Sequence, residues 1–494
     1  MNKAEQKTGR MSSDLEQNIG YLETFFHGNF DIKFRNFKLA CGTKACAVFL
    51  DGMTDRIEID EYIVMALQRE GQKDDVNSIL EQILNSAEAE IQSDMEELCH
   101  GVLNGDTVLL VDGQDQGLLL GTRKWGTRGI LEPPTSAVLK GPREGFNEDL
   151  KTNMTLIRRK LRSKELVFQS FEVGKYSNTA VCLCYLDDIV DKKIVKQVTD
   201  KLQKIEIDGI LDSSYIAKFL EIRTHSIFKQ VGTAEKPDIV AAKLLEGRIA
   251  LIVDGSPIVL TLPFLLLEDL QSPEDYYERR FRSTFARIIR FLGIIMSVLV
   301  PALYVSAQVY NLGMIPLRFT VTILNSIKGI PLSPALEMFF VVLIFEILNE
   351  ASVRMPKYVG MALSIVGALV LGETAVSAGI VSTPALMIMA ISAISLYTVP
   401  ELQNALSILR LAFLLLAGVM GVYGVLLGVI FTLNYLLSLE SYGTPYFAPF
   451  APLVPQDMKD SVVKQELADM TTRPKSFRNR NSIRLKTEKD GKNH

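Results

Sequence analysis

The chain has 494 residues, of which 53 are basic and 57 acidic, so its formal net charge is −4. Its mean hydropathy of +0.19 is too high for an ordinary soluble protein, and most of residues 291–438 are apolar. The composition therefore excludes a purely soluble globular protein, whereas the net charge excludes little, because each region has its own balance.

The N-terminal half, residues 1–280, mixes charged and apolar residues as a globular domain does. Residues 1–20 contain no apolar segment of the kind that forms a signal peptide, so we expect this half to stay on the cytoplasmic side of a membrane. The five cysteines lack the spacing of a metal site. Cys182 and Cys184 lie two apart in an expected apolar strand, which predicts that both pack in a core.

The N-terminal half also contains an internal duplication. Four segments form two similar pairs at offsets of about 134 to 142 residues: 32–52 with 166–188, and 105–122 with 247–263. Each copy is expected to contain two strands, then helices, then a hairpin that turns at an Asp-Gly pair, Asp112-Gly113 or Asp254-Gly255. Apolar residues near helical spacing predict amphipathic helices at 76–99 and 192–205. We therefore predict two similar α/β subdomains, at residues 1–130 and 164–280.

The motifs of common enzymes are missing from the sequence. It contains no phosphate-binding G-x-x-x-x-G-K-[ST], no dinucleotide-binding G-x-G-x-x-G, no H-E-x-x-H and no G-x-S-x-G. The four histidines form no plausible catalytic pair in the sequence. We therefore expect a protein that is not an enzyme and that needs neither a cofactor nor a metal.

Residues 131–163 connect the two copies and are predicted to form a linker followed by an amphipathic basic helix. Pro133 and Pro134 favour an extended entry, and residues 140–145 favour a turn. From Phe146 onward, apolar residues recur at spacings of three and four, which indicates a helix with one buried stripe. Four basic residues on its other faces are candidates for assembly or docking: Arg158, Arg159, Lys160 and Arg162. The alternatives are a solvated basic face or a surface for an acidic partner, a neighbouring copy or anionic lipid headgroups.

The apolar half predicts an α-helical polytopic membrane domain at residues 287–440. Its candidate spans are 287–310, 335–357, 358–380, 384–400 and 408–439. The last is too long for one upright helix, so it is either tilted or a hairpin broken near its glycines. Five arginines lie in residues 278–290, before and at the start of the first span, and the tail at 441–494 ends in a basic stretch. We therefore predict that both ends are cytoplasmic, with four to six crossings.

Ionisable residues inside these spans are the candidates for an ion pathway. Glu346, Glu350 and Arg354 follow a spacing of four, so they share one helix face, with Asn349 beside Glu346. Glu373 is expected deep in its own span. A charged residue in a span costs a few kcal/mol, so it must face protein or water. Two explanations stay open: glutamates that line a cation path, or buried pairing between helices or subunits.

Three segments carry a resemblance to a known family: 127–163, with its "GPREGFNEDLKTNMTLIRRKL", 281–291, "FRSTFARIIRF", and 446–452, "YFAPFAP". Together they resemble the A subunit of the spore germinant receptors of endospore-forming bacteria, and the resemblance covers essentially the whole chain. It implies a two-part cytoplasmic α/β domain followed by a membrane domain in the inner membrane of the spore.

The resemblance also implies partners and a function. Such A subunits act with a transporter-like B subunit, a lipoprotein C subunit and further A copies, in contact with membrane lipids and without nucleic acid. The complex senses nutrients and triggers release of monovalent cations, with the A oligomer as the ion-conducting part. The alternatives are a sporulation paralogue that acts with the dipicolinate channel, or a scaffold of the receptor that conducts no ions. An ordinary secondary transporter is disfavoured, because no matching pair of broken helices appears in the sequence.

Overall fold

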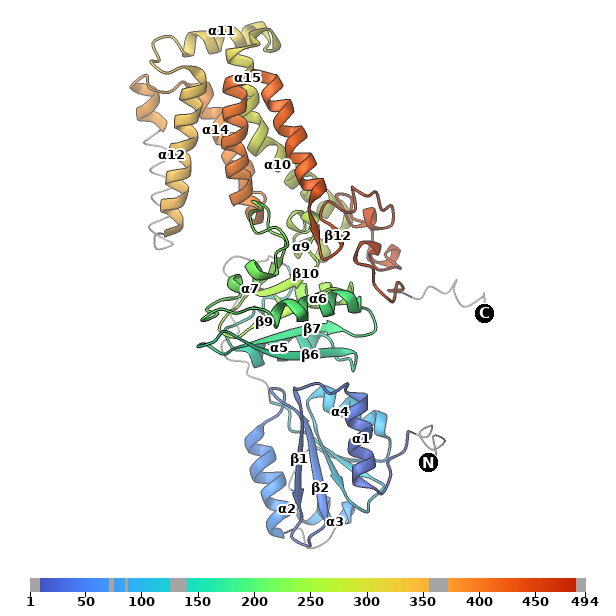
Figure 1. Ribbon diagram of the computed structural model, residues 1–494. Coiled ribbons are helices and arrows are strands. Elements are labelled where there is room, and N and C mark those ends of the chain that lie inside the picture. Colours follow the sequence, from blue (N-terminus) through green and yellow to red (C-terminus); the bar gives the residue numbers. More distant parts are fainter. Residues whose placement is uncertain (1–8, 71–74, 85–87, 125–139, 355–371, 486–494) are drawn as a thin grey trace, which may run out of the picture. The chain divides into compact units, whose positions relative to one another are not determined.

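The computed structural model describes residues 9–70, 75–84, 88–124, 140–354 and 372–485. The chain divides into two compact units. We call residues 1–224, 231–264 and 471–494 the α/β unit, and residues 225–230 and 265–470 the helical unit (Figure 1).

The first subdomain of the α/β unit is an antiparallel five-stranded sheet in the order β1-β2-β4-β5-β3. Its strands are β1 (Ile32–Lys38), β2 (Lys44–Leu50), β3 (Ala89–Gln92), β4 (Thr107–Val111) and β5 (Gly117–Leu120). Its helices are α1 (Leu15–Phe25), α2 (Met65–Glu70), α3 (Val76–Gln82) and α4 (Met95–Asn104). Alternate residues of β2 enter different cores: Cys46 packs with α1 and α4, and Ala47 packs with α2 and α3. The sheet is therefore covered by helices on both faces.

The second subdomain repeats this architecture, with the strand order β6-β7-β9-β10-β8. Its strands are β6 (Leu166–Val173), β7 (Thr179–Leu186), β8 (Gly232–Ala234), β9 (Ile249–Val253) and β10 (Val259–Leu262). Its helices are α5 (Leu150–Lys160), α6 (Lys192–Leu202), α7 (Ser213–Leu220) and α8 (Pro237–Leu245). Cys182 and Cys184 are free and fully buried on β7, as predicted. The predicted fold of two similar α/β subdomains is confirmed.

The duplication extends to individual hydrogen bonds. In the first copy the carboxylate of Asp112 accepts a hydrogen bond from the backbone N–H of Leu15, the first residue of α1 (3.3 Å). In the second copy Asp254 accepts one from Leu150, the first residue of α5 (3.1 Å). Each Asp-Gly hairpin turn thus caps the first helix of its own subdomain.

The predicted helix at 76–99 is wrong in part. Helix α3 ends at Gln82, and residues 89–92 form the edge strand β3 on β5 before α4 begins. The reason is a second helix cap: the side chain of Asp94 accepts a hydrogen bond from the N–H of Glu96 (2.8 Å) and starts α4.

Helix α5 lies where the sequence predicts the basic helix. It begins after Asp149, whose carboxylate accepts a hydrogen bond from the N–H of Thr152 (2.7 Å). Its apolar stripe, including Leu150, Met154 and Ile157, lies in the core of the second subdomain. The connector predicted at 131–163 therefore includes the first helix of the second copy, while Pro133 and Pro134 lie outside the described residues.

The predicted C-terminal tail is folded in part against the second subdomain. The Arg473 guanidinium donates to the carbonyl of Leu245 (2.7 Å), and the N–H of Arg480 donates to the carbonyl of Ile189 (2.8 Å). Phe477 is buried beneath the guanidinium of Arg248, whose carbon lies 4.0 Å from the ring centre.

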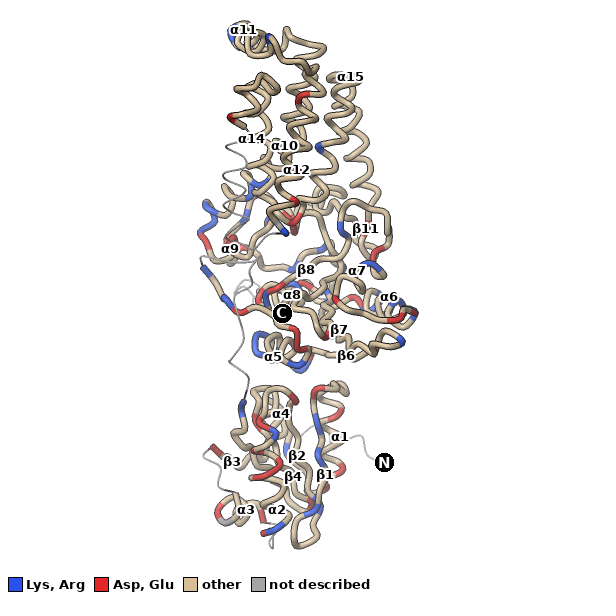
Figure 2. The backbone as a smooth tube through the Cα atoms, turned by 90° about the vertical axis from the view of Figure 1, so that its left-hand side faces the viewer, with Lys and Arg blue, Asp and Glu red and all other residues tan. Residues whose placement is uncertain are grey.

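The helical unit is a bundle of apolar helices, and Figure 2 shows few charged residues along its long helices. The helices are α9 (Glu274–Tyr277), α10 (Arg280–Val309), α11 (Leu317–Ser326), α12 (Pro334–Arg354), α14 (Thr383–Leu396) and α15 (Gln403–Ser438), followed by the short strands β11 (Glu440–Ser441) and β12 (Thr444–Pro445). Among the described residues, two helical segments are long and apolar enough to cross a membrane, Arg280–Val309 and Pro400–Ser438. Most of the span predicted at 358–380 lies outside the described residues.

Helix α15 is a hairpin of two helices. At Gly421 the backbone adopts φ 60° and ψ −141°, which is not helical. A side chain at Gly428 would meet the ring of Phe413 at 3.0 Å. Residues 15 positions apart on one straight helix would be about 22 Å apart, so the chain must turn back. The Tyr310 hydroxyl at the end of α10 donates to the Val419 carbonyl (2.7 Å) beside this turn.

The start of α10 and the segment that follows α15 lie together in the helical unit. Arg287, in α10, is buried and its guanidinium contacts Asp275 (3.0 Å) and Asp460 (2.9 Å), which lies after β12. Lys464 donates to the backbone carbonyl of Asp275. The segment that follows α15 therefore returns to the start of α10.

Candidate functional site

The joint between the two α/β subdomains is built around Arg158. Its side chain is 1% exposed, and Nη2 lies 2.7 Å from the carboxylate of Asp31, which precedes β1 of the first subdomain. Nη1 donates to the carbonyl of Leu166 (3.2 Å), and the guanidinium lies over the ring of Phe168. A buried charge that is paired and hydrogen-bonded in this way is costly to break. Arg158 therefore joins the subdomains of its own chain and presents no surface to a partner.

The buried amide of Asn29 adds a second connection. Its Nδ2 donates to the carbonyl of Leu166 (3.1 Å), and its Oδ1 accepts from the N–H of Phe168 (2.8 Å). The side-chain amide of Asn29 thus donates to one backbone group of β6 and accepts a hydrogen bond from another.

The other docking candidates are engaged at the periphery of this joint. Arg162 donates to the side chain of Asn104 in α4 (3.2 Å). Arg159 and Lys160 lie 3.6 Å and 3.0 Å from the carboxylate of Glu144 and stay partly exposed. Arg158 and Arg162 thus contact the first subdomain, whereas Arg159 and Lys160 contact Glu144.

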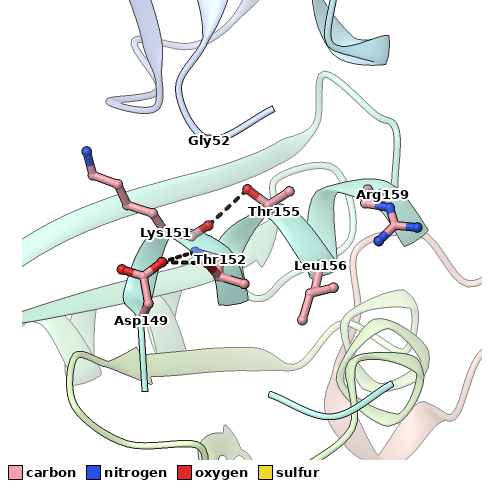
Figure 3. A pocket seen from close by; sticks show the side chains of 7 residues that line it. All are labelled: Gly52, Asp149, Lys151, Thr152, Thr155, Leu156 and Arg159. Carbon is pink, nitrogen blue, oxygen red and sulfur yellow. Dashed lines mark hydrogen bonds between the residues drawn. The ribbon is translucent and has the colours of Figure 1, made fainter. Parts of the chain in front are cut away.

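A small pocket of about 140 Å³ opens at the joint between Gly52 and the first turns of α5. Figure 3 shows Asp149 and Thr152 hydrogen-bonded to each other, and Thr155 donating to the carbonyl of Lys151 (2.9 Å). A side chain at Gly52 would meet the Thr155 hydroxyl at 2.7 Å and would require φ of +93°. The approach of the two subdomains therefore depends on glycine at this position.

Glu346 is half-buried in α12 and forms an ion pair with Arg410 of α15 (2.5 Å). Arg410 is 1% exposed, and its Nη1 donates to the hydroxyl of Ser392 in α14 (3.1 Å). The Ser392 hydroxyl in turn donates to the carbonyl of Ser297 in α10 (2.6 Å). This chain of contacts connects α10, α12, α14 and the first part of α15.

The remaining ion-pathway candidates are Asn349, Glu350 and Glu373. Asn349 accepts a long hydrogen bond from the Tyr397 hydroxyl (3.4 Å). Glu350 pairs with Arg354 on the exposed surface of the last turns of α12. Glu373 is exposed on the single chain and lies in a helical segment whose described part runs from residue 372 to residue 377.

Sequence reasoning missed Arg410 and Glu337. Arg410 is a single basic residue inside the apolar segment 408–439, a signal that marks a functional or paired residue. Glu337 lies in the first turn of α12, is 1% exposed, and accepts a hydrogen bond from the backbone N–H of Ser382 (2.5 Å). Its burial cannot be deduced from its position at the edge of an apolar run.

The family model described as Bacillus/Clostridium GerA spore germination protein matches residues 20–476. The chain belongs to this family. It is similar to the spore germination protein KA of Bacillus subtilis, at 35% identity over 96% of this chain and 88% of that protein. It is also similar to the spore germination protein GerLA of Bacillus cereus, at 35% identity over 93% and 95% of the two chains.

One more related protein and one solved structure are also similar to the chain. The uncharacterized membrane protein YfkQ of Bacillus subtilis is 34% identical over 94% of this chain and 92% of that protein. The crystal structure of the N-terminal domain of the A subunit of the Bacillus megaterium germinant receptor GerK3 is 27% identical, with a TM-score of 0.41, and covers 53% of this chain and 99% of that chain. As a GerA family member the chain is a membrane protein, an A subunit of a spore germinant receptor, and not an enzyme.

Proposed function

We propose that this GerA family subunit assembles with copies of itself into the cation-conducting part of a nutrient receptor. The observation that supports this most directly is Glu373. It is an acid beside apolar helices, it is exposed on the single chain, and it has no ion-pair partner among the described residues. Exposure of a carboxylate to lipid costs several kcal/mol, whereas a water-filled path between subunits would solvate it.

The partners and the location belong to the same proposal. The subunit acts in the inner membrane of the spore with a transporter-like B subunit and a lipoprotein C subunit. Its α/β unit and its C-terminal segment both lie on the cytoplasmic side. The return of the chain from α15 to the start of α10 supports this topology, because it requires an even number of crossings.

Glu373→Gln tests the cation path in spores. The substitution keeps the size of the side chain and removes its charge, so a carboxylate that attracts cations is lost without a change in packing. We expect nutrient-triggered potassium efflux to slow by about tenfold, which corresponds to about 1.4 kcal/mol. The measurement is potassium release from spores, with the amount of the protein checked in the inner membrane.

Glu81→Gln is the matched control, because Glu81 is an exposed acid in α3 of the α/β unit. We expect potassium efflux from Glu81→Gln spores to equal that from wild-type spores. Wild-type efflux kinetics in Glu373→Gln spores with normal protein levels would remove Glu373 from the path.

A further inference from the structure

Glu337 is a buried carboxylate with no basic partner among the described residues of the helical unit. It lies in the first turn of α12 and accepts a hydrogen bond from the N–H of Ser382, which caps α14. The N-terminus of α14 therefore faces this carboxylate, which also lies in the first turn of α12, and both positions stabilise its charge in part. They do not neutralise it, and a full charge at this degree of burial normally requires a counter-ion.

Two polar side chains of α10, one helical turn apart, lie near the same position. The Tyr304 hydroxyl lies beside Ser382 and Gln308 and near the Glu337 carboxylate. Among the described residues, the Tyr304 hydroxyl and both amide atoms of Gln308 have no partner at full hydrogen-bond geometry, although the hydroxyl approaches Ser382 and Gln308. Both side chains are more than nine-tenths buried.

Such a cluster needs an occupant, because a buried polar atom without a partner is destabilising. The cluster offers one carboxylate and several neutral oxygens, which are the ligands of hard cations. One negative charge balances one positive charge, and water alone would leave the carboxylate uncompensated. We propose that Glu337, Tyr304, Gln308 and Ser382 hold a single monovalent alkali cation.

The inference rests on the proposed cation path for its role, in which the site is a point where a permeating ion pauses. Binding itself does not depend on conduction. A carboxylate with neutral oxygens around it would hold a potassium or sodium ion weakly enough to release it, as conduction requires.

Thermal unfolding of the purified full-length protein tests the site. Melting is measured in detergent with increasing potassium or sodium chloride against choline chloride at constant ionic strength. A ligand that binds only the folded state raises the melting temperature as it saturates. We expect a saturable rise of about 2–5 °C for the wild type and none for Glu337→Gln.

Two further variants keep the test decisive. Glu350→Gln changes an exposed acid on the same helix and should keep the wild-type response. Tyr304→Phe removes one ligand oxygen and little volume, so we expect the midpoint cation concentration to rise about fivefold even if Glu337→Gln fails to fold. An unchanged midpoint in Tyr304→Phe would overturn the proposal.

Two other outcomes also contradict the proposed cation site, and a third separates it from the proposed cation path. A wild-type melting temperature that ignores potassium and sodium but rises with acid, and loses this rise in Glu337→Gln, would show that a proton occupies the site. A cation response that Glu337→Gln retains would place the ion elsewhere. Cation-dependent melting without nutrient-triggered efflux would leave the site intact and contradict only the proposed cation path.

Discussion

At the scale of single residues, two arginines form buried ion pairs within the chain. Arg158 and Arg410 are each 1% exposed and each is paired with a carboxylate, Asp31 or Glu346. The sequence shows that these residues are basic and lie in notable positions. It cannot show their partners, which are 127 and 64 residues away, because such pairs depend on how separate elements pack.

Arg158→Leu should destabilise the α/β unit. The substitution leaves the buried carboxylate of Asp31 without its cation, and breaking a buried pair in this way costs about 3–5 kcal/mol. We expect a large fall in the melting temperature of the α/β unit of the full-length protein. Arg159→Leu is the control, since its partly exposed contact with Glu144 should be worth less than about 1 kcal/mol. Equal melting of the two variants would contradict the role of Arg158 in the joint.

Asp269 should make the helical unit less stable as the pH rises through about 6. Burial raises the pKa of Asp269 to about 6, in spite of the ammonium of Lys229 at 2.8 Å, which also contacts Glu401. Because the folded protein binds this proton more tightly than the unfolded chain, the stabilisation is complete below pH 3.8 and is lost through pH 6.

The measurement is thermal melting at pH 5 and pH 7.5. We expect Asp269 to contribute a loss of about 1 kcal/mol between these values, and Asp269→Asn to lack it. Asp115→Asn, at an exposed position of the first subdomain, should keep the wild-type dependence. The interpretation fails if Asp269→Asn shows the same loss as the wild type.

At the scale of elements, the sequence predicted those features that repeat at short range. Alternating apolar residues and the Asp-Gly pairs marked the strands and hairpins, and the hydrogen bonds from Asp112 and Asp254 show that both turns have the same structural role. The break between α3 and α4 was missed, because β3 is a four-residue edge strand whose pairing with β5 leaves no clear local pattern. For the segment 408–439 the sequence left a tilted helix and a hairpin open, and the structure has a hairpin that turns at Gly421.

Gly421→Ala should disrupt this hairpin. Alanine would have to adopt φ of +60°, and its Cβ would lie 2.8 Å from the ring of Tyr310. We expect a loss of about 2 kcal/mol or more, seen as a lower melting temperature and as cleavage near residue 421 by added protease. Gly313→Ala is the control, because nothing lies within 4 Å of a Cβ built there. Equal stability of both variants would mean that the turn does not depend on glycine.

At the scale of the whole molecule, two units with different chemistry share one chain. The α/β unit uses duplication and a buried joint, and the helical unit uses a chain of polar contacts that begins at Arg410 and Glu346. The family could be predicted from the sequence, because "GPREGF" and the helix that follows it are specific to this family. Glu337 could not, because only the packing of α10, α12 and the start of α14 makes a boundary acid into a buried one.

The most direct test of the proposed function is cation release from liposomes that contain the purified receptor, with this chain and its B and C subunits. Liposomes loaded with potassium are exposed to a panel of nutrients, and potassium release is recorded for the wild type and for Glu373→Gln. The cation path predicts release that one nutrient class triggers and that Glu373→Gln slows. Nutrient binding without potassium release in the wild type would contradict it and identify the chain as a scaffold.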